Sequence, residues 1–362
     1  MAAPPTTSFT IGTRASKLAL VQTDAVKAAL KAAFPHYDFR VFSKETAGDL
    51  SMIALREFTS KNLWTEELEE LMMAGQVDFI VHSLKGSSAR SLNWYPPLVS
   101  FSSVKLTTSQ TPDVPTNLPP SCALGPMMPR EDSRDVLVVK QGLPYKSLSE
   151  IPAGSVVGTS SIRRTAQLAR HYPHLKVQDV RGNINTRLAK LDADDSPYTC
   201  IILAAAGLLR IDLGDRITQY LDSKNSGMLY AVGQGALGIE IRKDDHALRE
   251  ILAKIEDRDT TLACLAERSL LRTLEGGCSA PLGVETEWEQ SSEGTRRLKM
   301  KGIVVSVDGK EAAEIELSGE VDSPDAAEAL GITVAQALVD AGAGAILEAI
   351  QQKKVAKEAF SV

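Results

Sequence analysis

The chain has 362 residues, enough for two or three domains that each bury their own core. Its 43% hydrophobic and 24% charged residues are typical of a soluble protein, and a net charge of −6 argues against a general nucleic-acid-binding surface. The four cysteines, at positions 122, 200, 264 and 278, are far apart and form no Cys-x-x-Cys pair, so the sequence predicts neither a metal site of that kind nor a disulfide framework.

The start of the sequence has neither a basic segment nor an apolar run, which argues against a secretory signal. The longest apolar stretch, residues 201–209, is too short to cross a bilayer. We therefore expect a cytoplasmic protein, acting as a monomer without a membrane or nucleic-acid partner.

The first part of the chain alternates strands and helices. Strands are predicted over 9–11, 39–42 and 77–82, and helices over 17–33 and 63–74. In the first helix, Leu18, Val21, Ala25 and Ala29 recur close to helical spacing. This alternation predicts a largely parallel sheet with helices on both faces.

A second unit opens in the same way as the first. It has predicted strands over 155–157, 177–180 and 201–205, and helices over 162–171 and about 185–191. The segment Ile11-Gly12-Thr13-Arg14 is echoed by Val157-Gly158-Thr159-Ser160. The echo predicts two similar α/β domains, each presenting a strand-to-helix turn to a shared cleft.

The pattern changes from about residue 258. A helix over 261–274 is followed by an antiparallel hairpin within 297–321, turning at Asp308-Gly309, and by helices over 326–340 and 345–357. The sequence thus predicts a small α+β domain at the end of the chain. We expect residues 1–130 with 236–255 to form domain 1, 131–235 domain 2, and 256–362 domain 3.

A cysteine stands on a tight loop in this last domain. Cys278 follows Gly276-Gly277 and precedes Pro281, directly after the predicted helix. Cys200, inside a predicted strand, is typical of a cysteine that only packs. Cys278 is either a buried loop cysteine or an exposed thiol that acts as a nucleophile or attachment point.

Arginines gather where strands lead into helices. Arg163 and Arg164 fall in the first turn of a predicted helix, Arg14 just before another, and Arg181 and Arg187 beside a third. A cation at the start of a helix interacts unfavourably with the helix dipole, at a cost of roughly 0.3–1 kcal/mol in stability. The set is explained by an anionic ligand, and the alternative is solvent-facing arginines paired with acidic residues. Because no phosphate-binding glycine motif is present, carboxylates suit these arginines as well as phosphate does.

Eight stretches, spread almost from end to end, together resemble the porphobilinogen deaminase (hydroxymethylbilane synthase) family. They are TRASKLAL (13–20), KNLWTEEL (61–68), VHSLK (81–85), PRED (129–132), GTSSIRR (158–164), RGNINTR (181–187), GQGALG (233–238) and LEGGCSAP (274–281). The resemblance implies two domains like type II periplasmic binding proteins around a cleft, plus a small C-terminal α+β domain.

The resemblance also implies a chemistry. Cys278 would carry a covalent dipyrromethane cofactor through a thioether, as the primer on which four porphobilinogens are joined head to tail with loss of ammonia. The product would be a linear tetrapyrrole. The growing chain bears acetate and propionate groups, so the implied ligand is a polycarboxylate. The positions that match the family's cofactor- and substrate-binding residues are Arg14, Ser16, Lys61, Ser83, Thr159, Ser160, Ser161, Arg163, Arg164, Arg181, Arg187 and Gln234.

The sequence departs from the family at its catalytic motif. In the family an aspartate directly follows the lysine, and its carboxylate would stabilise the cation left by ammonia loss. Here Lys85 is followed by Gly86, and the pattern resumes at Asp113-Val-Pro-Thr116. Residues 86–112 thus read as an insert, and we expect Lys85 and Asp113 to be the catalytic pair. Our hypothesis is a retained intron or a mistaken gene model, the alternative being a natural loop.

Other interpretations stay open from the sequence. The chain could be an inactive form of the same enzyme, or a non-enzymatic protein that binds polycarboxylates in its cleft. A cysteine hydrolase would need a histidine near the thiol, and the five histidines show no recognisable pairing with Cys278.

Overall fold

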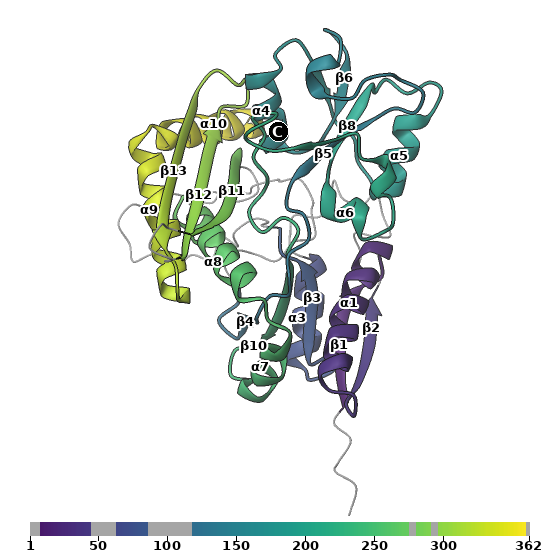
Figure 1. Cartoon of the computed structure of the whole chain (residues 1–362), viewed down its shortest axis with the longest axis vertical. Helices are drawn as coiled ribbons and strands as arrows, with labels where there is room; N and C mark the ends of the chain where they lie inside the picture. The colour runs from purple at the N-terminus through teal and green to yellow at the C-terminus, as the bar shows by residue number, and fades with distance from the viewer. Residues whose placement is uncertain (1–7, 45–62, 86–117, 275–279, 291–295, 360–362) are drawn as a thin grey trace, which may run out of the picture.

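The computed structural model describes residues 8–44, 63–85, 118–274, 280–290 and 296–359. The described residues form three sheets, and Figure 1 shows the first below the second, with the third beside them. The mixed α/β architecture with a smaller third unit agrees with the prediction.

The first sheet has the strand order β2-β1-β3-β10-β4. Strand β1 is parallel to β2 and β3, whereas β10 is antiparallel to β3 and β4. Its elements are β1 (Ser8–Arg14), α1 (Lys17–Ala33), β2 (Asp38–Lys44), α3 (Leu63–Met73), β3 (Phe79–Ser83), β4 (Cys122–Leu124), β10 (Leu237–Arg242), α7 (His246–Leu252) and the 3-10 turn η4 (Ala253–Ile255).

The second sheet has the equivalent order β7-β6-β8-β5-β9. Strand β6 is parallel to β7 and β8, and β5 is antiparallel to β8 and β9. Its elements are β5 (Asp135–Val139), η2 (Leu148–Glu150), β6 (Val156–Gly158), α4 (Ile162–His171), β7 (Lys176–Gln178), α5 (Ile184–Asp192), β8 (Cys200–Ala204), α6 (Ala205–Leu209), η3 (Gly214–Arg216) and β9 (Gln219–Leu221). Cys200 is buried in β8, as expected of a packing cysteine.

The strand register places the sequence echo at matching points of the two sheets. Gly12 lies opposite Ile80, the second residue of β3, and Gly158 opposite Ile201, the second residue of β8. The expectation of largely parallel sheets is confirmed for four of the five strands in each sheet, whereas β10 in the first sheet and β5 in the second run against the others. The chain crosses from β4 to β5 and back from β9 to β10, so each crossing strand enters its sheet at the edge where the parallel strands end, and runs against them.

The third sheet is antiparallel, in the order β11-β12-β13. The predicted hairpin, with Gly309 at φ +75°, and the predicted helices are confirmed, whereas the first strand was not anticipated. The elements are α8 (Arg258–Thr273), β11 (Leu282–Gln290), β12 (Arg296–Val305), β13 (Ala312–Glu320), α9 (Pro324–Asp340) and α10 (Ala343–Ala359). Among the described residues no single helix is long and apolar enough to span a membrane, and α9 with α10 meets that length and composition only as a pair bent by 76°.

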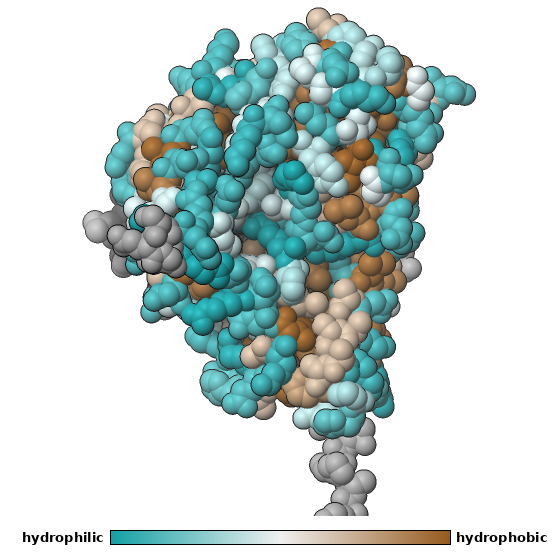
Figure 2. All heavy atoms as spheres, in the orientation of Figure 1, coloured by the Kyte–Doolittle hydropathy of each residue, from teal (hydrophilic) through white to brown (hydrophobic). Residues whose placement is uncertain are grey.

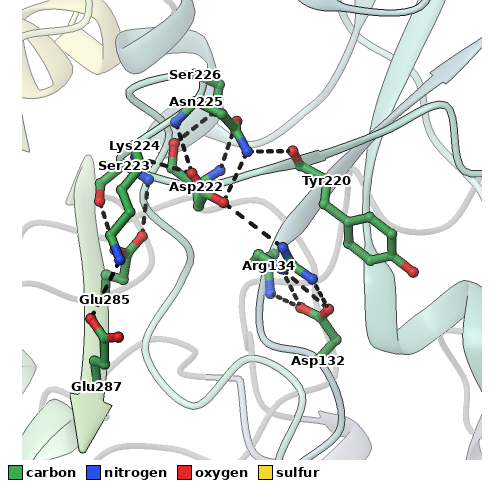
Figure 3. A network of polar contacts seen from close by, with 10 residues as sticks. All are labelled: Asp132, Arg134, Tyr220, Asp222, Ser223, Lys224, Asn225, Ser226, Glu285 and Glu287. Carbon is green, nitrogen blue, oxygen red and sulfur yellow. Dashed lines mark hydrogen bonds and ion pairs between the residues drawn. The ribbon is translucent and has the colours of Figure 1, made fainter. Parts of the chain in front are cut away.

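Polar contacts join the loop after β9 to the third sheet (Figure 3). Ser223 donates from its hydroxyl and its backbone N–H to the carboxylate of Glu285, at 2.6 and 3.0 Å. Lys224 lies 3.7 Å from Glu287 of the same strand. A backbone bridge between Tyr230 and Val284 continues this contact, so the second and third domains are docked at several points.

Candidate active site where the three domains meet

Four predicted site residues lie on one edge of the first sheet. Arg14 ends β1, and Ser16 caps α1 by accepting a hydrogen bond from Ala19 N at 3.4 Å. Ser83 ends the neighbouring strand β3, and its hydroxyl lies 2.8 Å from Nε2 of Gln22. Lys85 follows two residues later and is half-buried. Since β1 and β3 are parallel, their carboxyl ends bring these side chains to the same edge.

Three hydroxyl residues shape the loop between β6 and α4. Thr159 is buried, and its Oγ1 accepts from Ser161 N at 3.3 Å. Ser160 donates to Val180 O at 3.0 Å, and Ser161 caps α4 by accepting from Arg164 N at 3.5 Å. These bonds fix the first turn of the helix that carries the two adjacent arginines.

Arg163 and Arg164 share one buried carboxylate. Arg163 Nη1 lies 2.7 Å from Asp135 Oδ2, and Arg164 Nη2 lies 2.7 Å from Asp135 Oδ1. Both arginines are nearly inaccessible, with 4% and 3% of their surface exposed. Burial alone raises the pKa of Asp135, but the two guanidinium charges and their hydrogen bonds hold it well below its usual range. The arginines are therefore paired with an acidic residue, but they do not face solvent.

Positive charge is in excess around the start of α4 in the second domain. Asp135 pairs with two arginines, and burial together with the charge of Arg164 lowers the pKa of Arg163. The pKa of the half-buried Arg187 is lowered to about 10 by burial and by Arg164, and its Nε donates to Gly182 O at 2.7 Å. Arg163 Nη2 and Arg164 Nε are buried, and the described part of the chain gives them no hydrogen-bond partner. An anionic ligand would satisfy both the charge and the donors.

Arg181 lies at the rim rather than inside this group. Its side chain is 72% exposed, and it pairs at 3.0 Å with Asp179, which is 62% exposed. Arg181 thus reaches solvent, whereas its predicted partners in the second domain are buried or half-buried.

The turn at residues 233–236, in the segment that leads from β9 back to β10, contacts all three domains. Gln234 Nε2 donates to Ser133 O at 2.7 Å and to Asp135 Oδ1 at 2.9 Å. Ala236 O accepts from Leu84 N at 2.9 Å, beside Lys85. Gly233 adopts φ +69°, and a Cβ there would lie 2.6 Å from Leu84 O, so glycine is required. The Nε2 group of Gln234, a residue expected to bind ligand, is used by these protein groups, whereas its buried Oε1 has no hydrogen-bond partner among the described residues.

A buried glutamate of α8 holds this turn in place. Glu267 accepts two bonds from Arg130, at 2.6 and 3.0 Å, and a third from Gly233 N at 2.7 Å. Thr286 of β11 donates a further bond at 2.8 Å. Through Arg130 and Gly233, Glu267 therefore ties both connections between the first two domains to the third domain. Figure 2 shows a recess lined mainly by hydrophilic residues in the middle of the face that it presents.

Several of these residues were not singled out from the sequence: Asp135, Arg130, Glu267 and Arg210, whose Nη2 donates to Gly235 O at 2.6 Å. An acidic residue immediately before the apolar run of β5 was the available signal for Asp135. Three predicted residues, Lys61, Asp113 and Cys278, lie outside the described residues, as does the segment 86–112. Within the described ranges, no group of three or more His, Cys, Asp or Glu could hold a metal ion.

Comparisons with known proteins identify the relatives of this chain. Residues 9–90 and 101–250 match the family model "Porphobilinogen deaminase, dipyromethane cofactor binding domain", and residues 261–340 match "Porphobilinogen deaminase, C-terminal domain". The interruption of the first match at 91–100 falls inside the segment 86–112. The porphobilinogen deaminase of Yarrowia lipolytica is 49% identical over 95% of this chain and 94% of its own, and that of Schizosaccharomyces pombe is 43% identical over 99% of both.

Among solved structures, the chain is similar to a probable amino-acid extracellular-binding protein of Bacillus subtilis, with a TM-score of 0.39 and 10% identity over 69% of this chain and 91% of that one. The full-length matches to relatives and the two family models lead to one conclusion. The chain belongs to the porphobilinogen deaminase family.

Proposed function

We propose that this chain joins four porphobilinogens head to tail, releasing one ammonia at each addition, on a dipyrromethane primer bound to Cys278. Water then cleaves the bond between the primer and the four added units, which releases the linear tetrapyrrole hydroxymethylbilane and leaves the primer on the protein. The observation that carries the proposal is the arginine pair of the second domain. Two buried guanidinium groups share the single carboxylate of Asp135 and keep unpartnered donors. Such a group suits a ligand that brings several carboxylates.

The described residues fit the cofactor. A dipyrromethane carries acetate and propionate side chains and, when bound, supplies the pyrrole carbon to which the first substrate is joined. Arg163, Arg164 and Arg187 would bind those carboxylates from the second domain, and Arg14 from the first. Ser160 and Ser161 already bond to their own loop, so they would hold the loop open toward the ligand rather than supply the main charge.

We assign the bond-forming step to the first domain, across the cleft from these arginines. Each addition removes ammonia from porphobilinogen and leaves a positive charge beside the pyrrole ring. A carboxylate fixed there stabilises that charge, which is the role we assign to Asp113. Lys85 follows the end of β3 and would orient that carboxylate. We also propose that residues 86–112 impair this arrangement, because they separate the two residues along the chain.

We propose that the enzyme is a cytoplasmic monomer. Cys122, Cys200 and Cys264 are free thiols, which is compatible with a reducing compartment. Light scattering on the purified protein tests the oligomeric state: a mass near 38.9 kDa is expected, and a stable dimer contradicts it.

Intact mass tests the attachment site. The full chain should be heavier than its sequence by one dipyrrole, and Cys278→Ala should have the mass of the bare chain and release no ammonia from porphobilinogen. Cys122→Ala, which changes a buried thiol in β4, is the matched control and should keep the added mass. A protein with the bare-chain mass that still turns over porphobilinogen would refute the proposal, and tight binding without ammonia release would favour a non-enzymatic binding protein.

A further inference from the structure

Asp135 occupies a special place in the second sheet. It is the first residue of β5 and lies opposite Ala204, the last residue of β8, so its side chain starts at the edge where α4 begins. It is 1% exposed. Its carboxylate accepts three hydrogen bonds, from Arg163 at 2.7 Å, Arg164 at 2.7 Å and Gln234 at 2.9 Å.

Each guanidinium group that binds Asp135 is also held by a main-chain carbonyl. Arg163 Nη1 donates to Leu229 O as well as to Asp135. Arg164 Nη1 donates to Ile202 O at 2.7 Å, while its Nη2 donates to Asp135. A guanidinium group is planar, so two such bonds fix the directions of its remaining N–H groups. Those remaining groups include the buried, unpartnered Arg163 Nη2 and Arg164 Nε.

Simple neutralisation does not explain this arrangement. One carboxylate faces two guanidinium groups, so the cluster keeps a surplus positive charge in a buried place. An acid that served only to cancel charge would leave no cation in excess. The third bond comes from Gln234, which lies in the linker turn beside the end of β3. The carboxylate therefore joins the arginines of one domain to the backbone that supports Lys85 of the other.

We propose that Asp135 is a positioning residue for substrate and cofactor binding: it holds Arg163 and Arg164 so that their spare donors meet ligand carboxylates, and it ties them to the linker through Gln234. The inference rests on the proposed role of these arginines. Asp135 itself touches no ligand in this scheme. Its loss would therefore weaken binding through the arginines, in addition to any loss of stability.

The test compares three variants of the full-length, cofactor-loaded protein. Asp135→Asn keeps the shape but loses the charge, and Asp135→Glu keeps the charge but moves it by one methylene group. The matched control is Asp192→Asn, which breaks the two-bond pair of Asp192 with Arg216 in the same domain, at 2.8 and 3.1 Å. Intact mass gives the cofactor-loaded fraction, thermal unfolding gives Tm, and steady-state assays give KM and kcat for porphobilinogen.

We expect both Asp135 variants to raise KM about 10- to 100-fold, the size of one lost hydrogen bond to a charged group, with a smaller change in kcat. The control should keep its KM. If Asp135→Asn does not fold, Asp135→Glu decides: a raised KM with a Tm shift no larger than that of the control supports the proposal. Asp135 variants with a lowered Tm but an unchanged KM per loaded molecule would overturn it, because the residue would then be only structural.

An Arg163→Gln variant separates this inference from the proposed function. If Arg163→Gln raises KM and Asp135→Glu does not, the arginines bind ligand and Asp135 does not position them. If Arg163→Gln leaves both KM and cofactor content unchanged, the assignment of the arginines fails, and the inference about Asp135 fails with it.

Discussion

The two cleft-forming sheets have equivalent strand orders but carry different residues at one equivalent position. Strand β10 enters the first sheet opposite the end of β3, as β5 enters the second opposite the end of β8. The first residue of β10 is Leu237, and that of β5 is Asp135; both are buried. Leu237 packs in an apolar cluster with Ile11 and Phe79, whereas Asp135 binds two arginines.

The two domains thus share a backbone architecture but differ in the residues placed on it. The shared architecture brings strand ends and helix starts to the cleft in both domains. Within the described parts of the two domains, a buried carboxylate that holds paired arginines at this position occurs in the second alone. The first domain instead offers Lys85 and, in our proposal, Asp113. We infer that one edge is built to hold a polyanion and the other to perform the bond-forming step.

Placing a carboxylate at Leu237, the position equivalent to Asp135, should strongly destabilise the first domain. In Leu237→Asp the new charge would lie among apolar side chains, and an uncompensated buried charge costs about 3–5 kcal/mol. Urea unfolding against Leu237→Asn, the same shape without the charge, measures the cost at pH 7. Because burial raises the pKa of the new carboxyl, the deficit relative to Leu237→Asn should grow as pH rises and shrink toward pH 5. Equal stability of the two variants at pH 7 would contradict this.

Removing residues 86–112 tests the bond-forming role that we assign to Lys85 and Asp113 at the edge of the first sheet. Closing a loop of that length costs only about 3 kcal/mol, so the fold tolerates it, whereas misplacing a catalytic group by about 1 Å can cost roughly a hundredfold in rate. We expect the deletion, which rejoins Lys85 to Asp113, to raise kcat about a hundredfold. Adding Asp113→Ala to the deletion should abolish the gain. Equal activity with and without the segment would show that the segment is accommodated.

Matching arginine substitutions in the two domains should give different stability effects. Arg164→Gln and Arg14→Gln should each raise KM, by about 10- to 100-fold for a lost bond to a carboxylate. Only Arg164→Gln should also lower Tm clearly, because Arg164 is 3% exposed and bonded to Asp135, whereas Arg14 is half-buried. A larger fall in Tm for Arg14→Gln would mean that the first edge is the more rigid one.

Most of the fold followed from local patterns in the sequence. The long helices α1, α8 and α9 and the β12–β13 hairpin have strong periodicity or a clear glycine turn, and they were predicted within a few residues. The direction of β5 and β10 was not predicted, because it depends on where the chain crosses between domains. Apolar runs such as Val136–Val139 look alike in parallel and antiparallel strands.

The sequence indicated candidate site residues by their type, but not the residues that they pair with. Arg163 and Arg164 were identified, yet their carboxylate comes from Asp135, which lies 28 and 29 residues away along the chain. Glu267 binds Arg130 across 137 residues. Pairing at such separations is set by topology, and spacing along the sequence does not reveal it. A charged residue inside or beside an apolar run, as at Asp135, is the signal that such a partner exists.

The smallest effect on the fold is expected at the exposed edge of the arginine site. Arg181 and Arg40 are close matches: each is 72% exposed and pairs with an aspartate two residues earlier, at 3.0 and 2.8 Å. Exposed pairs of this kind contribute little to stability, so Arg181→Ala and Arg40→Ala should both leave Tm unchanged. Arg181 follows β7 near the arginines of the second domain, whereas Arg40 lies within β2 of the first sheet. Arg181→Ala should therefore raise KM for porphobilinogen, by about tenfold or less because water screens its charge, and Arg40→Ala should not. Equal KM values for the two variants would show that the anion site ends at the buried arginines and does not extend to the rim.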